Sequence, residues 1–136
     1  MSGARPGWAR AVGWAGAALA VAFLVGPPAV DPAHAHAVLV RSVPSHRAVL
    51  GQAPERVDLW FNERLEPAYS TVSIWNESGS QVDERDVTVA PDDPRRLTVT
   101  FGARAAGQYT VKYRVLSVDG HVVDSRFTFT VKGQRQ

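Results

Sequence analysis

Residue types that bind metal ions occur at two distant places in this sequence of 136 residues. Early in the chain, A-H-A-H-A-V-L-V (residues 33–40) places His34 and His36 two positions apart. Late in the chain, S-V-D-G-H-V-V places Asp119 and His121 two positions apart. Side chains at i and i+2 of an extended segment point to the same side, so this carboxylate and imidazole can meet one ion. The same D-G-H is also typical of an Asp-Gly hairpin turn beside a solvated histidine, and both interpretations stand at this point.

The residues before the first histidines have the pattern of a secretory signal. Arg5 and Arg10 precede an apolar run over residues 12–25, and Gly-Pro-Pro at residues 26–28 ends it. As a helix the apolar run would be about 21 Å long, shorter than a hydrocarbon core of about 30 Å. We therefore expect residues 1–35 to be a signal peptide rather than a membrane anchor.

The cleavage point decides which histidine remains. A signal peptidase requires small residues at the last and third-last positions before the cut, and Ala35 and Ala33 meet this requirement. A cut after Ala33 would place Asp31 at the third-last position instead. We expect cleavage between Ala35 and His36, which gives an extracytoplasmic domain of residues 36–136 with His36 as its first residue.

An N-terminal histidine offers two nitrogens to one ion, its free α-amine and its ring. The amine has an ordinary pKa of about 7.7–8.0, so a metal can displace its proton at neutral pH. Together with Asp119 and His121, the set contains three nitrogens and one oxygen, which suits a tetragonal Cu(II) site. The chain has no cysteine and a single methionine, Met1, so soft ligands for Cu(I) are missing. The alternative is that an alanine-rich cleavage region merely contains histidines.

The rest of the chain predicts an all-β domain. Apolar residues alternate with polar ones in many short segments, and Gly, Asp and Pro clusters separate them. About seven such strands need two sheets to bury their apolar faces, which predicts an antiparallel Greek-key sandwich or barrel with an immunoglobulin-like arrangement. Lys and Arg number 15 against 13 Asp and Glu, and no basic block is present, so we expect no nucleic-acid partner. The alternating segments are 37–43, 57–62, 71–75, 81–90, 97–101, 108–118 and 127–131.

These segments resemble the CopC family of copper-binding proteins over essentially all of the chain after residue 35. The residues that carry the resemblance are H-A-V-L-V-R-S-V-P, L-W-F-N-E, G-Q-Y-T-V-K-Y-R-V-L-S-V-D-G-H and F-T-F-T-V. The resemblance implies a seven-stranded CopC-type fold, a role in copper resistance or uptake, and a CopD-like membrane copper transporter as partner. It implies one Cu(II) per chain, held by the amine and ring of His36 with Asp119 and His121. Val38 stands where many members have a further histidine, and the Met-rich Cu(I) segment of some members is missing.

Glu63 falls at an acidic position that recurs in this family. It is either a hydrogen-bond acceptor that holds a metal ligand in place or a solvated loop residue. We expect His46, which follows a proline in a turn, to be a surface residue.

The leading functional hypothesis is a monomeric, non-enzymatic Cu(II) carrier or buffer. One alternative is an oxidative copper enzyme with an N-terminal histidine, as in lytic polysaccharide monooxygenases. The other is an immunoglobulin-like adhesion module that binds no metal.

Overall fold

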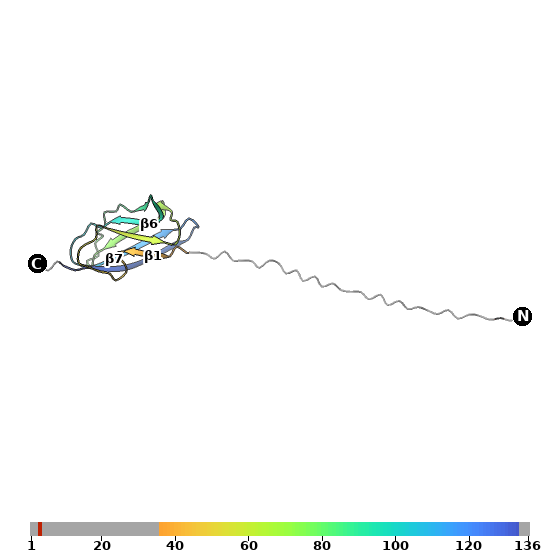
Figure 1. The fold of residues 1–136 in the computed structure, drawn as a ribbon, viewed down its shortest axis with the longest axis horizontal. Coiled ribbons are helices and arrows are strands. Elements are labelled where there is room, and N and C mark those ends of the chain that lie inside the picture. The colour runs from red at the N-terminus through yellow and green to blue at the C-terminus, as the bar shows by residue number, and fades with distance from the viewer. Residues whose placement is uncertain (1–2, 4–35, 134–136) are drawn as a thin grey trace. The chain divides into compact units, whose positions relative to one another are not determined.

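The computed structural model describes Gly3 and residues 36–133. Apart from Gly3, the predicted signal peptide (residues 1–35) lies outside the described residues, and so does the Ala35 side of its cleavage point. The folded unit spans Ala33–Gln136, and its described part is almost entirely strand and loop, with one short 3-10 helix, η1 (Pro67–Tyr69) (Figure 1). Among the described residues, the structure contains no helix with the length and hydrophobicity to cross a membrane.

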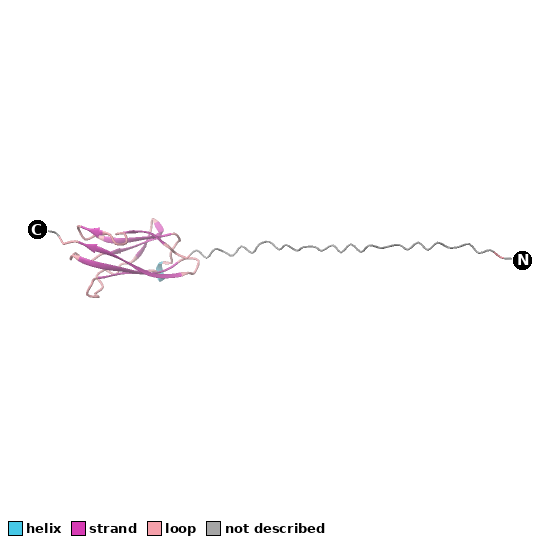
Figure 2. Ribbon diagram, turned by 90° about the horizontal axis from the view of Figure 1, so that it is seen from below, coloured by secondary structure: helices cyan, strands magenta, loops and turns pink. Residues whose placement is uncertain are grey.

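The strands form two layers of four strands each (Figure 2). Neighbouring strands are antiparallel except for one parallel pair, β2 and β8. The first sheet has the order β1 (Leu39–Val43), β3 (Arg56–Phe61), β6 (Asp93–Thr100), β5 (Thr88–Ala90). The second has the order β2 (Val49–Leu50), β8 (Val122–Val131), β7 (Gly107–Leu116), β4 (Thr71–Trp75).

The predicted all-β Greek-key sandwich is confirmed, but the number of strands differs. Residues 36–133 contain eight strands rather than seven. The additional strand, β2, has only two residues, and two residues are too few to show an alternating pattern.

The predicted strand over residues 81–90 is reduced to the three residues of β5. Before β5 the chain passes from one sheet to the other: Gln81 bridges to Trp75 of the second sheet, and Asp83 bridges to Phe101 beside the first. The Asp83 side chain is buried and accepts a hydrogen bond from the Ile74 N–H at 2.8 Å. This stretch is therefore a crossover between the sheets.

The core lies between the sheets and uses the apolar faces that the alternation predicts. Phe101, Tyr109 and Phe129 pack together with ring centroids 4.8–5.6 Å apart. The Tyr109 hydroxyl donates to the Ala105 carbonyl at 2.6 Å, which is the hydrogen bond of a tyrosine corner. Among the described residues, the buried apolar side chains extend from Ala37 to Val131.

Candidate metal centre

Three segments that are distant in the sequence meet at one end of the sandwich. β1 runs antiparallel to β3, and the pairing of Leu39 with Phe61 places the start of β1 beside the end of β3. The loop after β3 is joined to the end of β7, since Leu65 pairs with Ser117. The topology therefore brings His36, which precedes β1, to the loop that connects β7 with β8.

The rings of His36 and His121 contact each other at this end. Their centroids are 4.9 Å apart, and the planes meet edge to face at 83°. Metal–nitrogen bonds of imidazole are about 2 Å long, so two rings at this separation can turn toward a single ion. The structure thus brings together the two histidines that the sequence places at opposite ends of the domain.

Asp119 lies in the same loop as His121 and is held by several hydrogen bonds. Its Oδ1 atom is 3.1 Å from His121 Nδ1 and accepts the His121 backbone N–H at 3.2 Å. The hydroxyl of Ser117, which is fully buried, donates to the same oxygen. Gly120 between the two predicted ligands has φ +94°, a conformation that glycine adopts without steric cost and that closes the turn.

The electrostatics of this loop favour an ionised carboxylate. The hydrogen bond from Ser117, with further contributions from His121, lowers the pKa of Asp119 to about 2. The carboxyl group is therefore negatively charged across the physiological pH range, as a ligand for a divalent cation must be.

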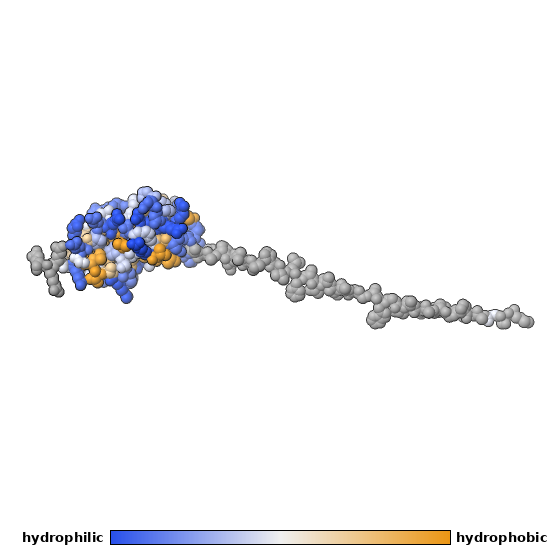
Figure 3. All heavy atoms as spheres, viewed as in Figure 1, coloured by the Kyte–Doolittle hydropathy of each residue, from blue (hydrophilic) through white to orange (hydrophobic). Residues whose placement is uncertain are grey.

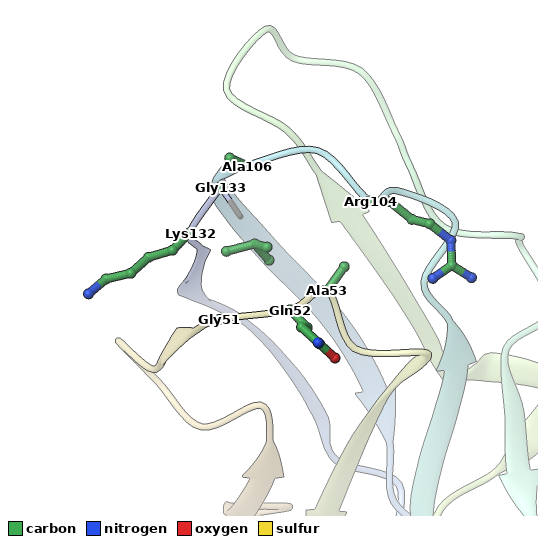
Figure 4. A pocket seen from close by; sticks show the side chains of 8 residues that line it. Gly51, Gln52, Ala53, Arg104, Ala106, Lys132 and Gly133 are labelled. Atoms are coloured by element: carbon green, nitrogen blue, oxygen red, sulfur yellow. The ribbon is translucent and has the colours of Figure 1, made fainter. Parts of the chain in front are cut away.

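The candidate site is an open surface rather than a cavity. The side chains of Asp119 and His121 are 34% and 27% exposed. A hollow of about 500 Å³ lies elsewhere, at the opposite end of the β7–β8 hairpin (Figure 4). It is lined by Gly51, Gln52, Ala53, Arg104, Ala106, Val131, Lys132 and Gly133. Figure 4 shows the Lys132 side chain extending away from this hollow. The open geometry suits an ion better than an organic ligand, which binds in an enclosed pocket.

Exposed valines flank each predicted ligand. Val38, Val118 and Val122 are 55%, 54% and 50% exposed. On the face drawn in Figure 3, hydrophobic and hydrophilic residues are interspersed. Each predicted ligand therefore has an exposed valine within two residues of it in the sequence.

The side chains alone do not form a complete metal site. Among residues 36–133, no group of three or more His, Cys, Asp or Glu side chains is arranged to hold a metal ion. The described side chains place His36 against His121 and His121 beside Asp119, but these two pairs do not gather into one cluster of three. The predicted set also needs the α-amine of His36, which in the uncleaved chain is the peptide nitrogen bonded to Ala35.

Glu63 and its neighbour Asn62 directly follow β3. Glu63 is partly buried, and its role stays a prediction. Asn62, which the sequence did not single out, hydrogen-bonds to the backbone on both sides of Ala37.

The structure also shows the contacts of Ser117 and His46. Ser117, also not singled out, holds Asp119, and its position two residues before the aspartate is the signal that could have indicated this contact. His46 is exposed, as expected, and its Nδ1 accepts the Thr128 N–H at 3.4 Å.

Comparison with known proteins gives consistent matches. The model of the CopC domain matches residues 39–132, a range that contains Asp119 and His121 and begins three residues after His36. The crystal structure of CopC from Methylosinus trichosporium OB3b is 39% identical, covers 74% of this chain and 98% of its own, and superposes with a TM-score of 0.69. The crystal structure of PcoC, a methionine-rich copper resistance protein from Escherichia coli, is 32% identical, covers 72% and 100%, and has a TM-score of 0.60.

A longer relative also matches. Copper transport protein CutJ from Bacillus subtilis (strain 168) is 29% identical over 110 residues, which are 80% of this chain and 20% of that protein. The chain therefore corresponds to about a fifth of the length of CutJ.

Proposed function

The chain belongs to the CopC family, and on that premise we propose that it is an extracytoplasmic carrier or buffer that binds one Cu(II) ion. The family includes copper resistance proteins, so a copper-related function follows from membership. The oxidation state, the ligands and the cellular setting are our proposal. The proposed ligands are the amine and ring of His36, the carboxylate of Asp119 and the ring of His121.

The observation that carries the proposal is the contact between the rings of His36 and His121. The full sequence contains four histidines, and the fold brings these two together beside an ionised carboxylate. Nitrogen and carboxylate ligands favour Cu(II), and the absence of cysteine removes the thiolates that favour Cu(I).

The proposed activation step is removal of the leader between Ala35 and His36. It creates the amine that completes the set, after export directed by the leader has taken the protein across the cytoplasmic membrane. The domain model of the family begins at residue 39, so this part of the proposal rests on the sequence pattern.

We propose binding rather than catalysis. Asp119 lies 3.1 Å from His121 and would fill a coordination position that an oxidative copper enzyme leaves open for oxygen. The exposed valines Val38, Val118 and Val122, near the proposed ligands in the sequence, support a protein partner that receives or delivers copper, and a CopD-like membrane transporter fits this role. The carrier itself is proposed to be a monomer.

The experiment that tests this function is intact mass spectrometry of the exported protein with and without Cu(II). The expected result is a chain that begins at His36 and gains one copper. The variant His121→Ala should lose that copper, whereas His46→Ala should keep it, because His46 lies away from the site. A leader that stays attached, or copper binding that survives His121→Ala, would contradict the proposal. A separate assay for peroxide production by the copper-loaded protein should give no activity above free copper.

A further inference from the structure

The backbone that precedes β1 is held by one side chain, Asn62. The Val38 N–H donates to Asn62 Oδ1 at 2.6 Å, and Asn62 Nδ2 donates to the His36 carbonyl at 3.3 Å. The Asn62 backbone N–H also donates to the Val38 carbonyl at 3.1 Å. One residue therefore makes three hydrogen bonds to the segment 36–38, and its carboxamide uses both its acceptor and its donor.

This contact extends the β1–β3 ladder beyond its last backbone pair. The named strands pair as far as Leu39 with Phe61. One residue further, the carboxamide oxygen of Asn62 takes the place that a backbone carbonyl has in a regular ladder. A chain terminus frays unless it is tied down, and in 36–38 the only buried residue is Ala37, at 1% exposed. Without the Asn62 carboxamide, residues 36–38 would be held by the burial of Ala37 and the single backbone hydrogen bond from Asn62 to Val38.

We propose that Asn62 is a positioning residue for the metal site: its carboxamide braces residues 36–38 so that His36 faces His121. This inference rests on the proposed Cu(II) function and adds a residue to it. Asparagine suits the role because one planar group carries an acceptor and two donors. The alanine side chain has no hydrogen-bond donor and no acceptor.

The brace also limits the ways in which Cu(II) can bind. A free peptide terminus offers its backbone amide nitrogens to Cu(II) in competition with distant side chains. The Val38 amide is engaged by Asn62 Oδ1 at 2.6 Å. The terminus held by Asn62 thus contributes His36 to a site shared with Asp119 and His121, instead of binding the ion through its own backbone amide nitrogens.

The test compares Asn62→Ala with Asn76→Ala in exported protein that begins at His36. Asn76 is the matched control because its carboxamide also makes two hydrogen bonds, both accepted by its oxygen, from the Ser80 N–H and the Ser78 hydroxyl, each at 2.8 Å. We expect Asn62→Ala to weaken Cu(II) binding about 10- to 100-fold in competition with a chelator, the usual effect of removing a residue that orients a ligand. Its electron paramagnetic resonance spectrum should show a second Cu(II) species, and Asn76→Ala should match the wild type in both measurements.

A merely structural role would lower the unfolding midpoint of the metal-free protein and leave the spectrum of the bound ion unchanged. Wild-type affinity and a wild-type spectrum in Asn62→Ala would overturn the inference.

A second measurement needs no variant. In the metal-free wild type, the brace predicts slow hydrogen exchange of the Val38 amide, and exchange at the rate of an unfolded peptide would overturn it. If the wild type has a slow Val38 amide and binds no Cu(II), the proposed function fails while the brace stands, so the two failures can be told apart.

Discussion

The two halves of the candidate metal site are built in different ways. In the loop from Ser117 to His121, the hydrogen bonds that Asp119 accepts come from residues two positions away, although the Val118 N–H also donates to the distant Arg64 carbonyl at 3.0 Å. In the segment from His36 to Val38, the hydrogen bonds to Asn62 span 24 and 26 residues, and the proposed amine ligand arises only by proteolysis. Asp119 is therefore held mainly by local hydrogen bonds, whereas the N-terminal half depends on the tertiary fold and on the proposed maturation.

The largest effect is expected from one alanine added before His36 in the exported protein. The addition keeps both imidazoles and Asp119 but moves the free amine off His36. We expect Cu(II) affinity to fall by more than about 100-fold, since removal of a direct ligand should exceed the effect of removing a residue that orients one. A chelator competition titration measures this change.

The control for the added alanine is a measurement on the loop half of the site, which the addition leaves unchanged. The pKa of Asp119 in the metal-free protein should stay near 2 with the added alanine, because its main cause is the Ser117 hydroxyl. Unchanged copper affinity would show that the amine is not a ligand.

The second prediction removes the charge of the loop half. Asp119→Asn keeps the shape and an acceptor for Ser117 but loses the negative charge that lies 3.1 Å from His121 Nδ1. We expect Cu(II) affinity to fall about 10- to 100-fold while the ring pair of His36 and His121 remains. A titration that shows no loss would exclude the carboxylate as a ligand.

The third prediction tests how the loop half is held. Ser117→Ala removes the hydroxyl that is the largest cause of the lowered pKa of Asp119. We expect that pKa to rise from about 2 toward the ordinary value of 3.8, as followed by NMR titration of the carboxyl carbon in metal-free protein. Because Asp119 stays ionised at neutral pH, copper affinity at pH 7 should fall by less than in Asp119→Asn. A pKa that stays near 2 would show that His121, and not Ser117, holds the carboxylate.

The sequence predicts the loop half of the site better than the N-terminal half, for a physical reason. Asp119 and His121 stand two residues apart, so their proximity depends on local backbone geometry alone. The role of Asn62 depends on the register of β1 against β3, where Leu39 pairs with Phe61 and the register shifts before Arg41. Such a shift leaves no trace in an alternating pattern.

The fold shows the same division between local and distant effects. The buried faces of the long strands follow from period-two alternation, and Val57, Leu59 and Phe61 of β3 are all buried. The segment before β5 also alternates, yet Asp83 becomes buried at the crossover and accepts the Ile74 N–H. A burial of this kind depends on two sheets that the local sequence does not specify.

The smallest expected effect concerns the end of the sandwich away from the metal site, where β6 ends at Thr100. Asp86 accepts the Thr100 N–H at 2.8 Å and its hydroxyl at 2.5 Å, and these hydrogen bonds lower the pKa of Asp86 below 3.8. A lowered native pKa stabilises the fold at pH values above 3.8, and the stabilisation disappears as the pH falls through the native pKa. Asp86→Asn should therefore lower the urea midpoint slightly at pH 7, and the difference from wild type should shrink in acid. Because Asp86 is exposed, solvent screening keeps this effect small. Copper affinity should not change in Asp86→Asn. A loss of affinity comparable to that of Asp119→Asn would mean that the two ends of the sandwich are energetically coupled.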